Sequence, residues 1–461
     1  MKKIKFAFIG AGSVSFCPAT VTDILLSEPL KQAELEIYLM DIAPEALAVS
    51  ESFCHRLNER LNRNVKIQAS TNLDAAVEGA DFVISAIEKD RYHYWSQDFH
   101  IPRRYGFRQV YGENGGPGGM FHFLRNAGPV LEIARAMEKY CPDAWLLNYS
   151  NPEAKLVELI SRLTRIKVVG LCHGEQMGVD QVSRFLELPR DVIDARASGL
   201  NHFGWFTSIR HRETGEDLYP LLREKEKQAS FLADWDEYAL TRIMFRTYGL
   251  WSYPGANHIG EYIAWSDAYL ASALIQYFHD PVEEDPWKSR HTPEFVYSFA
   301  QNPTARPLFK NRDGSAGDPG FTYKFDLSDD LHPSHEYGIR IAEAIAFSQP
   351  TPIGAVNVPN HGFIPGILDG MVVEVPALVD GQGIHPQATP ALPTAIASMI
   401  NQQGSIHDLL IQAFSEQSRN KLLQAMLLDP TISSYQNAVA LINEMCTMQA
   451  EILPTLIWNR N

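Results

Sequence analysis

Short apolar runs alternate with stretches of helical spacing over the first 190 residues, and this alternation limits the possible folds more than any other feature. The apolar runs lie at 4–9, 35–40, 65–68, 81–87, 144–149 and 167–171. Strands separated by helices are joined by crossovers, so they pair in parallel and carry helices on both faces. We predict an α/β chain that begins with a doubly wound parallel sheet, whose functional side chains gather at the carboxyl ends of the strands.

The pattern changes after about residue 190. Antiparallel-looking segments lie at 194–197 and 205–210, and the last sixty or so residues have helical spacing. Because 461 residues exceed what one simple core usually holds, we predict two domains. The first would be a dinucleotide-binding domain over residues 1–190. The second, over residues 191–461, would be mixed α+β and mainly helical, and would serve substrate binding, metal binding and oligomerisation.

Charge and cysteine usage limit the partners and the compartment. The chain has 40 Lys and Arg against 55 Asp and Glu, a formal net charge of −15, which argues against nucleic acid or an anionic membrane as main partner. Its five cysteines are odd in number and scattered, which is typical of free thiols in a reducing compartment. The first apolar run is too short for a signal peptide, and no run of about 18 apolar residues could span a membrane. We expect a cytoplasmic protein.

A glycine turn follows the first predicted strand. In Gly10-Ala11-Gly12-Ser13, small residues let backbone N–H groups approach a pyrophosphate at the start of a helix. Asp41 ends the second strand, where a carboxylate accepts hydrogen bonds from ribose hydroxyls and repels a 2′-phosphate. The usual third glycine is replaced by Ser15, and a purely structural turn remains the alternative. We predict a Rossmann-like NAD site formed by Gly10, Gly12, Ser13 and Asp41.

Metal-binding and polar side chains follow other apolar runs. Cys172 comes directly after 167–171, and His202 lies in a glycine-flanked segment at 199–204. A thiolate and an imidazole suit Mn²⁺, Fe²⁺, Co²⁺ or Ni²⁺ with open positions for substrate hydroxyls, although each residue alone is more often structural. Asn151, fixed by the following proline, is suited either to sugar hydroxyls or to a helix N-cap.

Together these motifs resemble glycoside hydrolase family 4, a family of NAD- and Mn²⁺-dependent glycosidases. The resemblance covers essentially the whole chain and is carried by Gly10-Ala11-Gly12-Ser13, Gly116-Pro117-Gly118-Gly119, Asn148 to Pro152, Cys172-His173-Gly174 and Asn201-His202. It implies that Cys172 and His202 bind the metal ion and that Asn151 and Asn201 contact substrate. It also makes His173 the candidate proton donor to the leaving group, and it implies a homodimer or homotetramer.

The catalytic base of the family, Tyr in some members and Asp in others, comes from the region that matches 254–262. That stretch contains no Asp, so we predict Glu261 as the base, with Tyr262 as second choice. The implied reaction begins with oxidation of the sugar at C3 by NAD⁺, which acidifies the C2 proton. Removal of that proton, loss of the aglycone, addition of water and return of the hydride complete the cycle.

The residues after Cys172 indicate the substrate. The run Cys172-His173-Gly174 resembles the α-glucuronidase and α-galacturonidase branch, which favours a uronic acid glycoside. Its carboxylate would need a cationic or hydrogen-bonding partner such as Arg103, Arg104, His258 or Arg290.

Other functions remain open at this stage. An α-glucosidase or α-galactosidase of the same family, acting on neutral sugars, is the alternative substrate assignment. An NAD-dependent dehydrogenase of the lactate/malate kind and a catalytically idle NAD-binding sensor are the alternatives outside the family.

Overall fold

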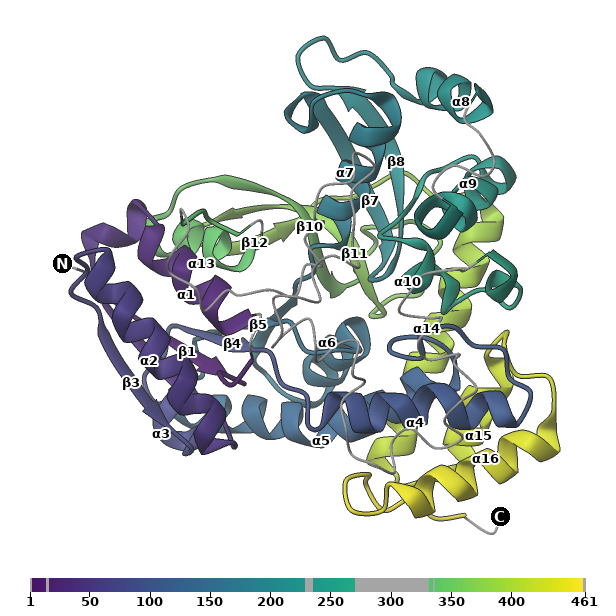
Figure 1. Cartoon of the computed structure of the whole chain (residues 1–461), viewed down its shortest axis with the longest axis horizontal. Helices are drawn as coiled ribbons and strands as arrows, with labels where there is room; N and C mark the ends of the chain where they lie inside the picture. The colour runs from purple at the N-terminus through teal and green to yellow at the C-terminus, as the bar shows by residue number, and fades with distance from the viewer. Residues whose placement is uncertain (1, 14–15, 229–234, 270–330, 335, 459–461) are drawn as a thin grey trace, which may run out of the picture.

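The structure is a computed structural model that describes residues 2–13, 16–228, 235–269, 331–334 and 336–458. Within these ranges one mixed sheet of twelve strands runs through the molecule in the order β3-β2-β1-β4-β5-β6-β10-β11-β7-β8-β9, with β12 beside β11 (Figure 1). The strands are β1 Lys2–Ile9, β2 Ala33–Met40, β3 Lys66–Ser70, β4 Phe82–Ser85, β5 Trp145–Asn148, β6 Lys167–Gly170, β7 Ile193–Leu200, β8 Phe203–His211, β9 Ser252–Tyr253, β10 Thr351–Pro359, β11 Val372–Asp380 and β12 Gly383–Pro386.

The first six strands form the parallel part of the sheet. All five pairings from β3 to β6 are parallel, and the order 3-2-1-4-5-6 reverses at β1, so β1 and β4 mark the point where ligands bind in doubly wound sheets. Burial along β4 is continuous because helices cover both faces. The predicted α/β, Rossmann-like, doubly wound class is confirmed.

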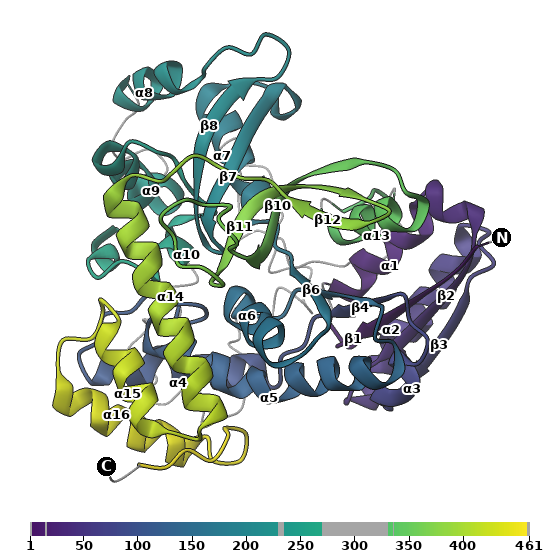
Figure 2. The ribbon, with the colours of Figure 1, turned by 180° about the vertical axis from the view of Figure 1, so that it is seen from behind.

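Helices cover the sheet and extend beyond it. Those of the first part are α1 Phe16–Leu26, α2 Pro44–Arg60, α3 Leu73–Val77, α4 Arg91–Arg104, α5 Gly116–Tyr140, α6 Glu153–Leu163 and α7 Gly174–Leu186. The remaining ones are α8 Tyr219–Gln228, α9 Trp235–Tyr248, α10 Ala256–Gly260, α13 Gly338–Phe347, α14 Thr394–Ser415, α15 Arg419–Leu428 and α16 Tyr435–Met448. The last three pack beside α4 and α5 although they lie far away in the sequence (Figure 2).

The second half of the chain continues the same sheet with antiparallel strands. β10 pairs with β6 through Asn357 and Gly170, and β11 pairs with β7 through Glu374 and Gly199. The β10–β11 hairpin therefore lies between the end of the parallel part and the β7–β8 hairpin (Figure 2). Strands from both sides of the predicted boundary at residue 190 share this sheet, while the two-domain division itself stays a prediction.

Two hydrophobic clusters hold these parts together. The larger one spans the parallel strands, β10, β11 and the C-terminal helices. A smaller one fills the space between α7, the β7–β8 hairpin and α9, where the rings of Phe206 and Tyr253 stack with centroids 4.5 Å apart. This second cluster fixes the hairpin against α7.

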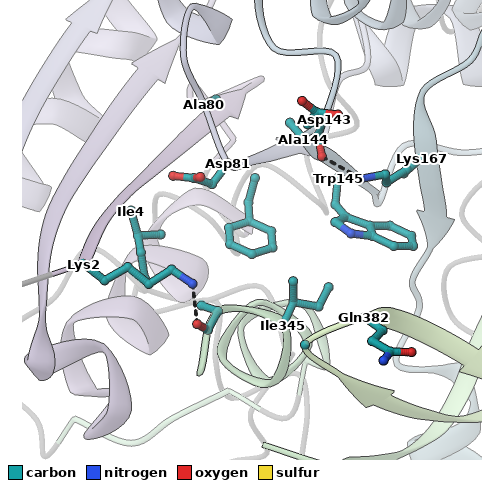
Figure 3. A pocket seen from close by; sticks show the side chains of 13 residues that line it. Lys2, Ile4, Ala80, Asp81, Asp143, Ala144, Trp145, Lys167, Ile345 and Gln382 are labelled. Carbon is teal, nitrogen blue, oxygen red and sulfur yellow. Dashed lines mark hydrogen bonds between the residues drawn. The ribbon is translucent and has the colours of Figure 1, made fainter. Parts of the chain in front are cut away.

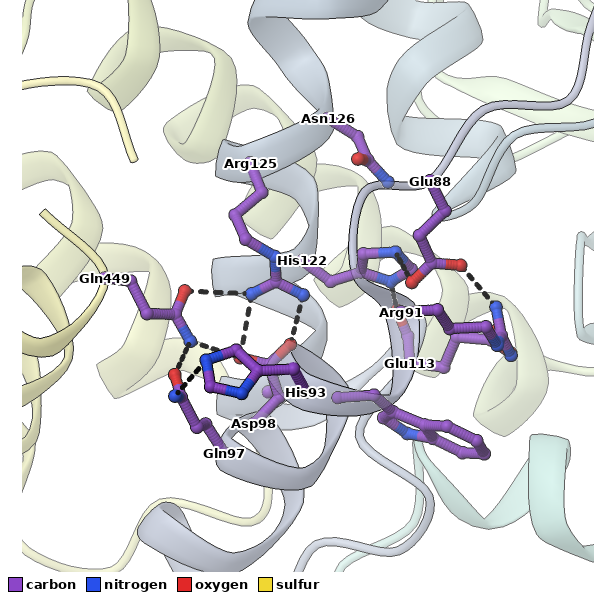
Figure 4. Close-up of polar contacts among 12 residues, drawn as sticks. Glu88, Arg91, His93, Gln97, Asp98, Glu113, His122, Arg125, Asn126 and Gln449 are labelled. Atoms are coloured by element: carbon purple, nitrogen blue, oxygen red, sulfur yellow. Dashed lines mark hydrogen bonds and ion pairs between the residues drawn. The ribbon is translucent and has the colours of Figure 1, made fainter. Parts of the chain in front are cut away.

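A buried ion pair joins α4, α5 and the segment after α16 (Figure 4). Arg125 donates to both carboxylate oxygens of Asp98, at 2.9 and 2.5 Å, and to Gln449 at 3.0 Å. Gln449 in turn donates to Gln97 at 3.0 Å. Burial raises the pKa of Asp98, and the Arg125 charge is the largest effect that opposes that rise, so the ionised carboxylate depends mainly on Arg125.

Replacing Arg125 tests how far this network supports the fold. We expect Arg125→Met to lower the free energy of unfolding by about 3–5 kcal/mol, because it leaves Asp98 buried without a counter-charge. The control is Arg135→Met on the exposed face of the same helix, which should change it by less than about 0.5 kcal/mol. Equal urea midpoints for the two variants would contradict the assigned role.

Candidate active site

The glycine turn after β1 brings the predicted nucleotide-binding residues together. The Gly12 N–H donates to Asp41 Oδ2 at 2.7 Å, and the Ala43 N–H donates to Asp41 Oδ1 at 2.9 Å. Ser13 Oγ accepts from the Phe16 N–H at 3.1 Å, at the start of α1. The turn thus connects the end of β1, the end of β2 and the first turn of a helix, which is the arrangement that a dinucleotide site requires.

Gly10 occupies a position in this turn that requires glycine. Its φ is +93°, and a Cβ placed there would lie 2.3 Å from the carbonyl oxygen of Ala86. The backbone just after β1 therefore runs directly against the backbone just after β4. Ile87, one residue further, donates its N–H to Ser150 Oγ at 2.9 Å, so the ends of β1, β4 and β5 are connected.

Cys172 and His202 lie side by side. Cys172 stands between β6 and α7, His202 stands in the turn between β7 and β8 with φ +62°, and Cys172 Sγ is 3.3 Å from His202 Nε2. Two ligands bound to one divalent ion at about 2.3 Å (sulfur) and 2.0 Å (nitrogen) are separated by a similar distance. The predicted metal ligands, 30 positions apart in sequence, are thus brought together.

The protonation preferences of this pair suit a cation. Burial, reinforced by the negative charges of Glu374 and Glu336, raises the pKa of the Cys172 thiol well above its ordinary value, so the thiolate needs a positive partner. The Gly174 N–H donates to the sulfur at 3.3 Å. Burial lowers the pKa of His202 well below its ordinary value, which keeps the imidazole neutral and able to bind a metal ion.

The neighbours of His202 include two more predicted residues. Asn201 Nδ2 donates to Glu374 Oε2 at 3.5 Å, and Tyr262 Oη donates to the Asn201 carbonyl at 3.5 Å. The Tyr262 ring stacks on Phe203 with centroids 5.0 Å apart. Burial raises the pKa of Tyr262 well above its ordinary value. Asn201 thus belongs to the turn that carries His202, and Tyr262 packs against that turn.

Glu261 is fully buried and fastens the glycine-dense loop before α5. Its Oε2 accepts the backbone N–H groups of Glu113, Asn114 and Gly115, at 2.8, 2.5 and 2.7 Å. Its Oε1 has no hydrogen-bond partner and lies 3.8 Å from His258 Nδ1. Burial raises the pKa of this carboxyl, which His258 opposes. Only Oε1 is available to accept a proton, and the role as base stays a prediction.

Asn151 and His173 have different surroundings in the candidate site. Asn151 Nδ2 is 3.4 Å from Glu113 Oε1, on the side of the glycine-dense loop. His173 is the N-cap residue of α7. Its side chain is about half exposed, and its Nδ1 is 3.2 Å from Glu336 Oε1. A half-exposed imidazole beside a carboxylate suits proton transfer, which is compatible with the predicted role.

Sequence reasoning missed a charged group at the end of β4 (Figure 4). Arg91 pairs with Glu88 and with Glu113, each at 2.5 Å, and His122 Nε2 is 3.1 Å from Glu88 Oε1. Burial would raise the pKa of Glu88, but the charges of Arg91 and His122 outweigh it and lower the pKa far below its ordinary value. Glu88 lies three residues after β4, and the prediction that functional side chains gather at the carboxyl ends of the strands could have indicated it.

The cations suggested for a substrate carboxylate are mostly elsewhere. Arg103 donates to the Gln109 carbonyl at 2.7 Å from the last turn of α4, where Arg104 also lies. Arg290 lies outside the described residues. His258 is the one that contacts a predicted metal ligand, with its ring centroid 4.3 Å from that of His202.

A separate cavity of about 230 Å³ lies at the amino ends of the parallel strands (Figure 3). The first residues of β1, β4, β5 and β6 line it. Lys2 and Lys167 donate their ammonium groups to backbone carbonyls there. Because the candidate site lies beyond the carboxyl ends of the same strands, this cavity is not part of it.

Comparison with known proteins identifies the family. The model of the family 4 glycosyl hydrolases matches residues 5–188, and that of their C-terminal domain matches residues 197–432. This chain belongs to glycosyl hydrolase family 4. It is therefore a glycosidase, which confirms the predicted family and enzyme class over the dehydrogenase alternative.

Relatives match over nearly their full length. The chain is 32% identical to an α-glucosidase of Erwinia rhapontici, covering 96% of this chain and 98% of that protein. It is 32% identical to an α-galactosidase of Bacillus subtilis (strain 168), covering 98% and 99%. An α-galacturonidase of Thermoanaerobacter italicus is 27% identical, covering 98% and 97%.

A solved 6-phospho-α-glucosidase from gut microorganisms, in complex with NAD and Mn²⁺, has the same fold. The TM-score is 0.78 at 24% identity, and the match covers 99% of this chain and 100% of that one. Among the described residues, no helix combines the length and hydropathy needed to cross a bilayer.

Replacing Gly10 and Gly79 in separate variants distinguishes two reasons for a glycine: the close approach of another backbone segment and the positive φ angle. Gly79→Ala is the matched control, because Gly79 has φ +66° and open space around it. We expect Gly79→Ala to cost about 1–2 kcal/mol of stability through strain alone. Gly10→Ala adds a clash with Ala86 and should also raise the dissociation constant for NAD, as measured by calorimetry. Unchanged NAD affinity in Gly10→Ala would contradict the assignment of the turn.

Glu175, the second residue of α7, should make stability depend on pH. Burial raises its pKa from 4.5 to about 7, despite a hydrogen bond of 2.8 Å from Tyr337 Oη. The folded state therefore favours the neutral acid, a contribution present below about pH 4.5 and lost as pH rises through 7. Between pH 4.5 and 8, we expect the free energy of unfolding measured with urea to fall by about 3 kcal/mol less in Glu175→Gln than in the wild type. The exposed Glu132→Gln should keep it, and identical pH profiles for the two variants would refute the claim.

Proposed function

We propose that the chain is an α-glycosidase that depends on NAD and on Mn²⁺ or another divalent transition ion. The observation that carries this is the 3.3 Å approach of Cys172 Sγ to His202 Nε2. Cys172 follows β6 and His202 lies in the β7–β8 turn, in the sheet whose β1 ends in the glycine turn. A solved protein of the same fold in complex with NAD and Mn²⁺ supports the pairing of cofactors.

When bound, NAD⁺ supplies a hydride acceptor for sugar C3, and the cation polarises the oxygens at C2 and C3. The residues of this chain then handle protons and orientation. Glu261, or Tyr262 as second choice, removes the C2 proton, a role typically worth about 10²–10⁴ in rate. His173 protonates the leaving oxygen, while Asn151 and Asn201 hold sugar hydroxyls.

The proposed substrate is an α-glycoside of a uronic acid. The run Cys172-His173-Gly174 supports it, and so does the existence of an α-galacturonidase relative. A neutral α-glucoside or α-galactoside is a second candidate, favoured by the higher identity to relatives of those activities. The charge near Asn151 also favours it, because Arg91 is already shared between Glu88 and Glu113.

A panel of four substrates separates these candidates. Hydrolysis of the p-nitrophenyl α-glucuronide, α-galacturonide, α-glucoside and α-galactoside is measured with NAD⁺, Mn²⁺ and dithiothreitol. We expect p-nitrophenol to be released from a uronide. Its release from the α-glucoside or α-galactoside alone would establish the second candidate. Deuterium at C2 or C3 should slow the reaction, whereas a rate insensitive to both labels would contradict the oxidative route.

Exchange of Cys172 tests the metal assignment. We expect Cys172→Ser to lose Mn²⁺-dependent hydrolysis, because a hydroxyl replaces the thiolate ligand, while NAD binding and the circular dichroism spectrum stay unchanged. Full activity in this variant would remove Cys172 from the site.

Assembly and location stay predictions. The chain is proposed to act in the cytoplasm on a small-molecule glycoside, as a homodimer or homotetramer.

A further inference from the structure

Four side chains converge next to the Cys172–His202 pair. Glu113, His202, His258 and Glu261 each offer one nitrogen or oxygen, and these four atoms all lie within 4.8 Å of one another. Donors bound to a common ion at about 2.0–2.2 Å are at most about 4.4 Å apart, so small side-chain shifts would let one ion contact all four. We call this set the four-ligand cluster.

The cluster also contains buried polar atoms that lack partners. His202 Nδ1, His258 Nδ1 and Glu261 Oε1 have no hydrogen-bond partner. His202 is 6% exposed and Glu261 is 0% exposed, so bulk water cannot supply the missing hydrogen bonds. Buried polar atoms are normally paired, and three unpaired ones at a single place indicate an absent common partner. Two imidazoles and a carboxylate oxygen would be satisfied together by a divalent cation.

This position differs from the one between Cys172 and His202. Cys172 does not belong to the four-ligand cluster, and its sulfur faces His202 Nε2 at 3.3 Å. A neutral imidazole has a single lone pair, so His202 can serve only one cation at a time. The two positions are therefore alternatives for one ion.

The surrounding charges suit a divalent ion with nitrogen and oxygen ligands. Glu113 shares its charge with Arg91 at 2.5 Å, and Glu261 directs its other oxygen to three backbone N–H groups. Both carboxylates are thus held in place by contacts outside the cluster. Mn²⁺, Co²⁺ and Zn²⁺ accept such a mixed ligand set.

We propose that Glu113, His202, His258 and Glu261 form a second position for the divalent cation, which holds the ion without the Cys172 sulfur. The ion would stay next to the site when that thiol is oxidised or replaced. The inference goes beyond the proposed glycosidase function and concerns only where this chain binds a cation.

The experiment measures Co²⁺ binding to the full chain by calorimetry and by metal analysis after gel filtration. The wild type should bind one Co²⁺ per chain and show the thiolate-to-cobalt charge-transfer band. Cys172→Ser should still bind one Co²⁺ but lose that band, and His258→Ala should keep both ion and band. The double variant, which combines Cys172→Ser with His258→Ala, should bind Co²⁺ at least about tenfold more weakly than Cys172→Ser, because both positions are then impaired.

Controls keep the outcome interpretable. His361→Ala, at an exposed histidine outside the site, should bind Co²⁺ like the wild type. Retained NAD binding in each variant establishes that it is folded. The proposal is overturned if folded Cys172→Ser binds no Co²⁺, if the double variant binds as tightly as Cys172→Ser, or if the wild type binds two ions. Loss of hydrolysis in Cys172→Ser, by contrast, bears only on the proposed function.

Discussion

The β10–β11 hairpin keeps the two predicted metal ligands together, because it pairs with the strands that precede both of them. Gly170 at the end of β6 pairs with Asn357, and Gly199 in β7 pairs with Glu374. Asn357 Nδ2 also donates to Glu374 Oε2 at 3.3 Å across the hairpin. A hairpin that begins 149 positions beyond His202 thus sets the distance between the thiol and the imidazole.

Buried charge is the second constraint on this site. Glu261 is fully buried, yet three backbone N–H groups compensate one of its oxygens, and nearby Lys155 donates to the Asn114 carbonyl at 2.5 Å. Burial lowers the pKa of Lys155 to about 8, although the negative charges of Glu261 and Asp429 oppose that fall. Such groups are costly without partners, which is why the glycine-dense loop and the stretch around His258 have to fold against each other.

Much of the fold follows from local patterns. The parallel strands and the glycine turn were predictable because continuous burial and a strand-to-helix turn leave a signature within a few residues. Cys172 and His202 were recognisable because each follows such a signature. The sequence did not predict that β10 and β11 would lie between β6 and β7, since pairing between distant strands has no local signal.

The acid–base part of the site was less predictable for a related reason. Glu261 was proposed because the family resemblance places the base in 254–262, a stretch without Asp. The three amides that bind one of its oxygens come from a loop nearly 150 positions earlier. The pairing of Arg91 with Glu113 likewise joins the first residue of α4 to the loop before α5, 22 positions further along the chain. Side-chain direction in such loops depends on tertiary contacts, so a role assigned from residue type remains coarse.

Anomalous diffraction at the manganese edge, from crystals grown with NAD and Mn²⁺, tests the central claim most directly. The account predicts one strong peak bonded to Cys172 Sγ and to a ring nitrogen of His202, with the nicotinamide ring next to it. A peak remote from both side chains, or a dinucleotide bound away from Gly10 and Asp41, would contradict it.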